Sequence, residues 1–452
     1  MEKTLTNDLT TGSPTRIILK FSVPMLIGNL FQQFYYIIDS AIVGKFVGKE
    51  ALAAVGATGS LIFLIIGLTF GLSAGISIVI SQYFGAQDYE NVKKGFATAA
   101  YIIIGASSIM GIVGFFSTRT LLELLNTPDT IIRQAEMFMK ISFAGILGIS
   151  CYNGMAAVLR ALGDSLTPLK FLAVACFVNI GLDFLFVLVF HWGVPGVAFA
   201  TVISQVTAAI GCIVYSMVKY KLLHMPLKEF RPNKNMFNKC IKLGVPVALQ
   251  NSLVSLSMMM LQKVINNYSD IVIAANTAVN RIEQLVLMPG MSIGAAVASF
   301  AGQNVGAGRQ DRAKQGYNSA SIIIIIFSLM MLPVMYFGSE YIMKFFTRKE
   351  DFEVVLTGVK AIRITCFFYS AVGMIFVSRN FLSGTGDIIM PMFMGLSEVA
   401  CRIILAYTLT AFMGCYGIWW ATGINWFLTS LVGITRVHFG KWKTKSIVKQ
   451  VA

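Results

Sequence analysis

The sequence predicts an all-α membrane protein with twelve transmembrane helices in two six-helix lobes. We expect the lobes to be related by a pseudo-two-fold axis along the membrane normal. The first reason is composition. Hydrophobic residues make up 56% of the 452-residue chain and charged residues only 13%, against roughly 25% charged residues in an ordinary globular domain. The second reason is a set of motifs that occurs twice, at an almost constant distance along the chain.

Long apolar stretches account for the predicted helices. A helix needs about 20 mainly apolar residues to cross the hydrocarbon core of a bilayer, which is roughly 30 Å thick. Residues 17–43, 51–81, 97–117 and 169–190 meet this length. Over the whole chain we expect twelve spans, at approximately 16–43, 51–82, 94–117, 132–161, 167–190, 194–219, 240–266, 272–302, 315–338, 353–383, 388–412 and 416–437.

The distribution of Lys and Arg predicts the orientation of these spans. Most of the 36 basic residues lie in the terminal segments and in alternate loops, above all in 219–242 and 436–449. Because basic loops stay on the cytoplasmic side, we expect both termini in the cytoplasm and a multi-pass protein of the cell (plasma) membrane. The net charge of +15 follows from this bias. We therefore expect the lipid bilayer, not nucleic acid, as the partner of a monomeric protein.

Four motifs recur in the same order in both halves, at offsets of 221 to 223 residues. Each half holds six predicted spans, so both halves enter the membrane from the same side, and parallel repeats of this kind place the substrate site at their interface. We divide the chain into an N-terminal lobe (1–219), a cytoplasmic linker (220–239) and a C-terminal lobe with a basic tail (240–452). The matching positions are Pro24 and Pro246, Gly85 and Gly306, Gly163-Asp164 and Gly386-Asp387, and Gly196 and Gly417.

Cysteine and histidine give no indication of an enzyme. The seven cysteines form no CxxC pair, and most lie in apolar runs, where cysteine behaves as a small packing residue. The three histidines are far apart in the sequence, so neither a metal cluster nor a nucleophile–histidine pair is visible. We predict no catalytic residue and no cofactor beyond a coupling ion, Na+ or H+.

Ionisable residues within spans are costly and therefore indicate functional positions. Asp39 follows Tyr35 by one helical turn in the first span, and Asp183 follows Asn179 by one turn in the fifth, so each pair shares a helix face. Thr201 in the sixth span lies at a similar depth. Two carboxylates with hydroxyl and amide neighbours suit a sodium ion or a shared proton. The alternative for Asp39 is an ordinary solvated residue at the membrane interface.

The second half carries different polar residues. Glu398 and Arg402 are spaced to form an ion pair along one helix. The alternative is that Glu398 or Glu283 faces the substrate cavity and attracts a cationic compound. Methionine provides an adaptable apolar wall, although such residues are more often simple packing. Our candidates for the substrate cavity are Gln33, Asn280, Glu283, Glu398 and Met288.

These motifs together resemble the multidrug and toxic compound extrusion (MATE) family over nearly the whole chain. No single motif is specific, but their ordered set is. The resemblance rests on Pro24 with Asp39 fifteen residues later, Asp39-Ser40-x-x-Val43-Gly44, Gln82-x-x-Gly85-Ala86, Arg160-Ala161-Leu162-Gly163-Asp164, Asn179-x-x-x-Asp183 and Gly193-x-x-Gly196-x-Ala198-x-Ala200-Thr201.

The resemblance implies an antiporter that expels cationic or amphipathic compounds by alternating access as Na+ or H+ enters. Pro24 would act as a hinge, because proline removes a helix hydrogen bond. Some branches carry an acidic residue in the seventh span where this chain has Val254, so we expect no cation site of that kind in the C-terminal lobe. The implied N-terminal cation site, with Asp39 and Asp183 as candidate Na+ ligands, consists of Tyr35, Asp39, Asn153, Asn179, Asp183 and Thr201.

A lipid-linked oligosaccharide flippase of the same broader superfamily is the alternative function. Such a flippase needs a basic cavity for a diphosphate, and only Arg281 and Arg402 are strongly intramembrane arginines. For the antiporter we expect competition. A cation bound near Asp39 and Asp183 favours substrate release outside, and its discharge to the cytoplasm resets the protein, which requires different affinities in the two states.

Overall fold

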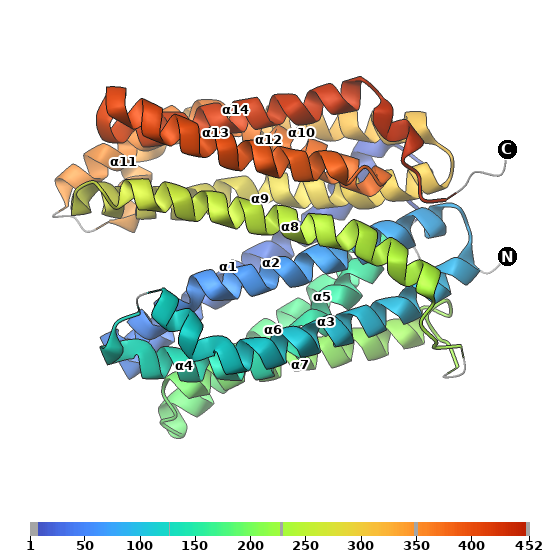
Figure 1. Cartoon of the computed structure of the whole chain (residues 1–452), viewed down its shortest axis with the longest axis horizontal. Coiled ribbons are helices and arrows are strands. Elements are labelled where there is room, and N and C mark those ends of the chain that lie inside the picture. The colour runs from blue at the N-terminus through green and yellow to red at the C-terminus, as the bar shows by residue number, and fades with distance from the viewer. Residues whose placement is uncertain (1–7, 126, 227–228, 348–350, 449–452) are drawn as a thin grey trace. The chain divides into compact units, whose positions relative to one another are not determined.

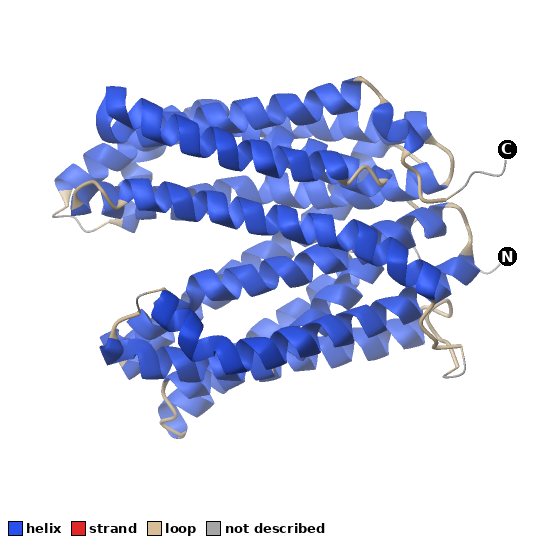
Figure 2. Cartoon of the chain, viewed as in Figure 1, coloured by secondary structure: helices blue, strands red, loops and turns tan. Residues whose placement is uncertain are grey.

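Within the part of the chain that the computed structural model describes, every regular element is a helix (Figures 1 and 2). The described residues are 8–125, 127–226, 229–347 and 351–448. Both ends of the chain, for which we predict a cytoplasmic location, lie outside them. The all-α class predicted from composition is confirmed.

The helices follow one another with short connections. The first seven are α1 (Pro14–Ile42), α2 (Lys49–Gly85), α3 (Tyr89–Leu124), α4 (Asp129–Ala144), α5 (Ile146–Ala161), α6 (Leu166–Asp183) and α7 (Val194–Lys219). The π-helical segments η1 (Val43–Val47) and η2 (Phe184–Val189) extend α1 and α6. The remaining helices are α8 (Lys234–Ile265), α9 (Asp270–Gly306), α10 (Gln310–Phe346), α11 (Phe352–Thr365), α12 (Tyr369–Thr385), α13 (Ile389–Met413) and α14 (Gly417–His438).

The number of membrane spans agrees with the sequence. Among the described residues, ten helical stretches are long and apolar enough to cross a membrane. The pair α4 and α5, bent by 49° at Gly145, adds a broken span. The stretch Ile389–His438 contains both α13 and α14, which pack on each other, so it supplies two spans. Twelve spans result, and the chain is a multi-pass membrane protein.

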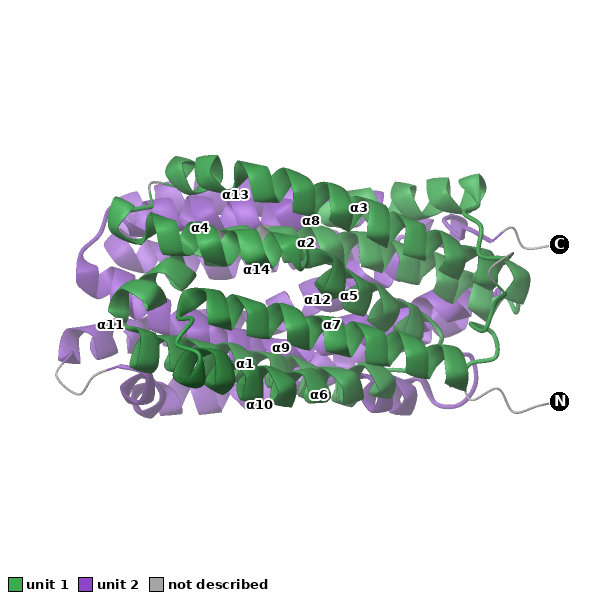
Figure 3. Ribbon diagram, turned by 90° about the horizontal axis from the view of Figure 1, so that it is seen from below, with its two compact units in different colours: residues 1–8, 23–248 green, residues 9–22, 249–452 purple. Residues whose placement is uncertain are grey.

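The chain forms two compact units, which are coloured separately in Figure 3. In the described part of the chain, unit 1 contains Asp8 and residues 23–248, and unit 2 contains residues 9–22 and 249–452 up to the described end. The stretch that we predicted as a linker packs within unit 1. There, the hydroxyl group of Tyr101 donates to the carbonyl oxygen of Phe230 at 3.0 Å.

Two helices begin in one unit and continue in the other. The change occurs between Ser22 and Val23 in α1 and after Ala248 in α8. Each change lies within two residues of a proline inside the helix, Pro24 or Pro246. Proline removes one backbone hydrogen bond and is a common cause of helix bending. The repeated proline therefore marks the point where each of these helices passes between units.

The internal repeat is visible in the backbone of each unit. Gly163 in unit 1 and Gly386 in unit 2 have φ values of 84° and 90°, and Gly193 and Gly414 have 61° and 60°. Residues with a Cβ avoid this region, so glycine is required at these turns. The helices also pair alike, because α2 packs on α3 and α5 as α9 packs on α10 and α12. The repeat predicted from the motifs is confirmed by these matching turns and pairings.

Glycines set a very close helix contact within unit 1. A Cβ atom on Gly71 would lie 2.3 Å from the Cα atom of Ala248, and one on Gly75 would lie 2.4 Å from that of Gly244. Both helices thus carry small residues at a spacing of four, which lets membrane helices approach backbone to backbone. This contact joins α2 to the first half of α8.

A buried carboxylate closes an equivalent turn in each unit. In unit 1, Asp164 accepts hydrogen bonds from two backbone N–H groups at the start of α6, both at 3.0 Å, and from Nζ of Lys219 at 3.2 Å. In unit 2, Asp387 accepts from Nε of Arg436 at 2.7 Å. The repeated Gly-Asp motif therefore ties the turn to the end of α7 in unit 1 and to the end of α14 in unit 2.

Candidate functional site

Four helices of unit 1 carry the predicted cation-binding residues, and Asn153 lies apart from the others in α5. Asp39 lies in α1, Asn179 and Asp183 lie in the last two turns of α6, and Thr201 lies in the first part of α7. Helices α6 and α7 are consecutive and pack along each other. The three sequence motifs are thus brought together by neighbouring elements of one compact unit.

Both aspartates lie next to a change of helix type. Asp183 is the last residue of α6 before η2, and Asp39 lies four residues before η1. Each π segment contains a backbone hydrogen bond between residues five positions apart. These bonds run from Gly48 N to Val43 O and from Phe190 N to Leu185 O, both at 3.0 Å. The two segments contact each other. Single π turns in α-helices are rare and occur frequently at functional sites.

Asp39, Asn179 and Asp183 contain buried polar atoms that have no hydrogen-bond partner in the described structure. Asp183 is completely buried and Asn179 is 1% exposed. The side chains of Asp39 and Asp183 are close enough to interact electrostatically. Yet both oxygens of Asp183, Oδ1 of Asp39 and both amide atoms of Asn179 are buried without a hydrogen-bond partner. Buried polar atoms are nearly always satisfied, so the unsatisfied atoms of these three side chains are an exception within unit 1.

Tyr35 links α1 to α7 close to Asp39 and Asp183. Its hydroxyl group donates to Oγ1 of Thr201 at 3.2 Å, and Thr201 in turn donates to the carbonyl oxygen of Val197 at 3.0 Å. Tyr35 precedes Asp39 by four residues in α1, so the phenol lies one turn from the carboxylate. This bond connects α1 to α7 beside the two aspartates.

Asn153 and Gln33 are less closely connected to this group. The amide nitrogen of Asn153 donates to the carbonyl oxygen of Ile149, one turn earlier in α5, at 3.0 Å. Gln33 is half-buried in α1. In the described structure neither is recorded in contact with the aspartates, so their roles remain predictions.

An ion triad joins α12 and α13 in unit 2. Oε1 of Glu398 lies 3.0 Å from Nη2 of Arg402, which confirms the ion pair expected from their spacing. Oε2 of the same carboxylate lies 2.8 Å from Nη2 of Arg379 in α12. The sequence did not indicate Arg379, because it lies on a different helix and 19 residues away. Each carboxylate oxygen of Glu398 is therefore paired with an arginine.

The other candidates of unit 2 lie along α9. Asn280 is exposed, whereas Glu283 and Met288 are buried. Oε1 of Glu283 is buried without a partner, as is the hydroxyl group of Tyr369 at the start of α12. Glu283 thus retains a free carboxylate oxygen, while Glu398 does not.

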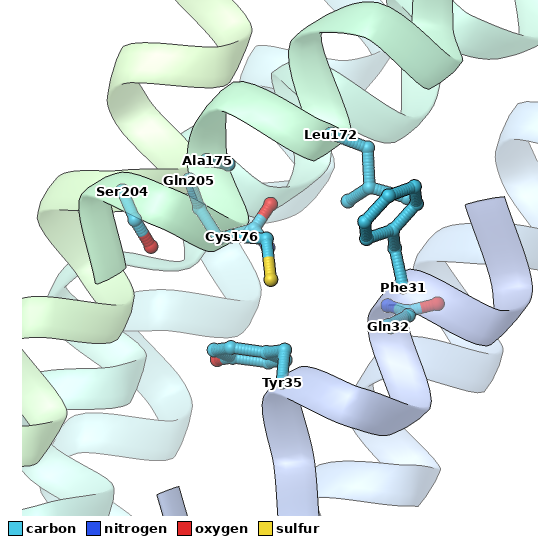
Figure 4. Close-up of a pocket in the computed structure, with 8 residues that line it drawn as sticks. All are labelled: Phe31, Gln32, Tyr35, Leu172, Ala175, Cys176, Ser204 and Gln205. Atoms are coloured by element: carbon cyan, nitrogen blue, oxygen red, sulfur yellow. The ribbon is translucent and has the colours of Figure 1, made fainter. Parts of the chain in front are cut away.

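A small cavity, which the sequence did not predict, is lined in part by Tyr35, and neither aspartate is among its lining residues. Figure 4 shows side chains of α1, α6 and α7 around it, and its volume is about 10 Å³, roughly enough for one water molecule. Ser204 and Cys176 contribute to it but appear in the sequence as ordinary small residues of apolar helices. Among the described residues, no group of three or more His, Cys, Asp or Glu is placed to hold a metal ion.

Comparison with known proteins gives a consistent assignment. The family model described as MatE matches residues 24–185 and 246–408. The probable multidrug resistance protein YpnP of Bacillus subtilis is 30% identical over 97% of this chain and 98% of its own length. The multidrug export protein MepA of Staphylococcus aureus is 24% identical over 94% of this chain and 93% of its own.

Solved structures share the fold. A MOP superfamily transporter from Pyrococcus furiosus, described as having a binding pocket of reversed polarity, superposes with a TM-score of 0.92 at 22% identity. The alignment covers 98% of this chain and 100% of that one. An outward-facing multidrug resistance MATE family transporter gives a TM-score of 0.91 at 23% identity, with the same coverage.

Proposed function

Since the chain belongs to the MATE family of multidrug efflux transporters, we propose that it is an antiporter driven by Na+ or H+. It exports small cationic or amphipathic compounds across the plasma membrane by alternating access. The names of YpnP and MepA, which refer to multidrug resistance and export, support this class of substrate. The protein acts as a monomer with both termini in the cytoplasm, in agreement with the basic loops.

The unpartnered polar atoms of Asp39, Asn179 and Asp183 carry this proposal. Two ionised carboxylates in contact repel each other in a medium of low dielectric constant, so one of them favours binding a proton or a cation. Sodium prefers hard oxygen ligands, which the carboxylates and the Asn179 amide oxygen provide. The same group therefore serves either coupling ion.

Coupling follows from the cost of leaving this site empty. An uncompensated charge in the membrane interior is unfavourable by at least a few kcal/mol. Binding of the coupling ion removes that cost only in the conformation in which the two carboxylates lie together. An ion with different affinities for two conformations shifts their populations by that difference. In this proposal α1 bends at Pro24 when the coupling ion binds or leaves. Pro24 lies next to the boundary between Ser22 and Val23, where α1 passes from unit 2 to unit 1.

Four of the predicted cavity residues contact the substrate in this proposal, namely Gln33, Asn280, Glu283 and Met288. Glu283 attracts the cationic group because one of its oxygens is free. Glu398 is instead held by Arg379 and Arg402 and maintains the local structure. Asn280 and Met288 provide polar and adaptable apolar contacts along the same helix.

Transport of a fluorescent organic cation by reconstituted vesicles tests the function. Vesicles are given a Na+ gradient at equal pH, or a pH gradient without Na+, and efflux is recorded in each case. We expect one of these gradients to accelerate efflux and the other to have little effect. Absence of efflux under both gradients would contradict the proposed function.

A further inference from the structure

The segment that precedes α1 (residues 9–12) is bound by the last turn of α9 and the connection to α10. The backbone N–H group of Leu9 donates to Oε1 of Gln303 at 3.0 Å, and its carbonyl oxygen accepts from Nδ2 of Asn304 at 3.2 Å. Nη1 of Arg309 donates to the carbonyl oxygen of Thr10 at 2.7 Å. The Leu9 side chain is 3% exposed, and both amide side chains are fully buried. The segment is therefore held through its backbone and through a buried apolar side chain.

The first part of α1 is also fixed within unit 2. Gly12 has a φ of 85°, which residues with a Cβ avoid, and this turn leads the segment into the helix. In the first turn of α1, Oγ1 of Thr15 donates to Oγ of Ser319 in α10 at 3.0 Å. Residues 9–22 all belong to unit 2. The attachment thus extends almost as far as Pro24.

The internal repeat provides an equivalent attachment for α8 in unit 1. The backbone N–H group of Asn233, which directly precedes α8, donates to Oγ1 of Thr98 at 3.1 Å. Nζ of Lys239, in the second turn of α8, donates to the hydroxyl group of Tyr83. Two pairs of positions, each 221 residues apart, correspond in the two units, namely Tyr83 with Asn304 and Thr98 with Ser319. Equivalent positions therefore hold the start of each helix that later changes unit.

The attachment of residues 9–12 is stable because its polar groups are paired with one another. Detachment would break three hydrogen bonds and return the Leu9 side chain to water. Buried polar groups that lose their partners are costly, and so is the exposure of an apolar side chain. The docked segment is therefore favoured in any conformation that keeps the turn between α9 and α10 intact.

We propose that Gln303, Asn304 and Arg309 are positioning residues, which keep the start of α1 attached to unit 2 throughout the transport cycle. Asp39 lies in the same helix beyond Pro24, in the part that belongs to unit 1. A movement of unit 2 is therefore transmitted along α1 to Asp39, and the helix adjusts at Pro24, where a backbone hydrogen bond is missing. This inference rests on the proposed function and adds to it the residues that fix one end of α1.

A reversible cross-link tests whether the attachment persists during transport. Thr15→Cys with Ser319→Cys replaces two hydroxyl groups whose oxygens lie 3.0 Å apart, near enough for an S–S bond of about 2.05 Å after small side-chain rotations. Efflux of a fluorescent organic cation is recorded before oxidation, after oxidation and after reduction by dithiothreitol, and peptide mass analysis confirms the link. We expect the linked protein to retain at least half of the wild-type rate. Loss of efflux on linking that reduction reverses would overturn the inference, because α1 would then have to detach.

Rescue by the same cross-link tests whether Gln303 acts through α1. Gln303→Leu removes the acceptor of the Leu9 N–H group. Gln310→Leu is the matched control, because Nε2 of Gln310 donates instead to the carbonyl oxygen of Lys443 at 3.0 Å. We expect efflux to be at least fivefold lower for Gln303→Leu, to return to within twofold of the wild type when the cross-link is formed, and to be unchanged for Gln310→Leu.

Three results of the rescue experiment would overturn the inference. These are an undiminished rate for Gln303→Leu, an equal loss for Gln310→Leu, and a loss for Gln303→Leu that the cross-link does not restore. If Gln303→Leu yields no folded protein, the cross-link in the otherwise wild-type chain decides the question. Absence of wild-type efflux under both gradients instead refutes the proposed function itself.

Discussion

Replacement of Asp183 by Asn separates the coupling role of this residue from a structural one. Asp183 is fully buried, and neither of its oxygens has a partner. The substitution keeps the shape of the side chain and removes one negative charge. Because a contact to a charged group contributes about 1.5–3 kcal/mol net, the affinity for the coupling ion should fall roughly 10- to 150-fold.

The assay is efflux of a fluorescent cation from proteoliposomes as a function of the coupling-ion concentration. We expect the half-saturating concentration of Asp183→Asn to rise by that factor. Asp311→Asn is the control, because Asp311 is an exposed carboxylate that pairs only at the surface, with Nζ of Lys443 at 3.4 Å. Its ion dependence should equal that of the wild type.

The same variant makes an opposite prediction for stability. A buried carboxylate without a partner is unfavourable, so its neutralisation should leave the midpoint of thermal unfolding unchanged or raise it. If Asp183→Asn instead lowered the midpoint and left the ion dependence unchanged, Asp183 would be a structural residue and the reasoning would be refuted.

Three further predictions concern the packing of the units. Glu398→Gln removes the carboxylate that pairs with the buried Arg402 and the partly buried Arg379 and should cost about 3–5 kcal/mol. An unchanged unfolding midpoint would contradict this. Burial alone would raise the pKa of Asp164, but its hydrogen bonds outweigh burial and lower the pKa. Its stabilisation is therefore complete at neutral pH and lost as the pH falls through that lowered pKa. The difference in midpoint between wild type and Asp164→Asn should accordingly shrink on acidification below about pH 4, and a difference independent of pH would refute it. Gly75→Ala places a Cβ 2.4 Å from a backbone atom of α8 and should reduce the yield of folded protein. Gly56→Ala is the control, because the space around Gly56 is open, and its yield should be unchanged. Equal yields of the two variants would argue against the close packing of α2 and α8.

Much of the fold was predictable because it follows from local sequence. Apolar length determines the spans, and glycine is favoured where the backbone has a positive φ. The recurrence of Gly163 as Gly386, and of Gly193 as Gly414, therefore marks equivalent turns in the two halves. The sequence also led us to group Asp39 with Asp183. A charged residue in an apolar span is costly, so its presence indicates a functional position.

Other features depend on contacts between distant segments. Arg379 reaches Glu398 from another helix, and no periodicity within either helix indicates that pairing. The cavity near Ser204 arises from how three helices meet, although its residues are individually unremarkable. The π turns after Asp39 and Asp183 likewise could not be recognised from the sequence. Their hydrogen bonds join residues five positions apart, and the residue types involved are the same as in an α-helix.

Release of the bound ion by the transported compound tests the central claim most directly. Purified protein in weakly buffered solution is mixed with a saturating organic cation, and the protons or radioactive Na+ set free are counted per molecule of protein. The account predicts that the wild type releases about one ion per substrate bound, as expected from reciprocal linkage, and that Asp39→Asn releases none. Equal release by Asp39→Asn and the wild type would show that the coupling ion binds elsewhere.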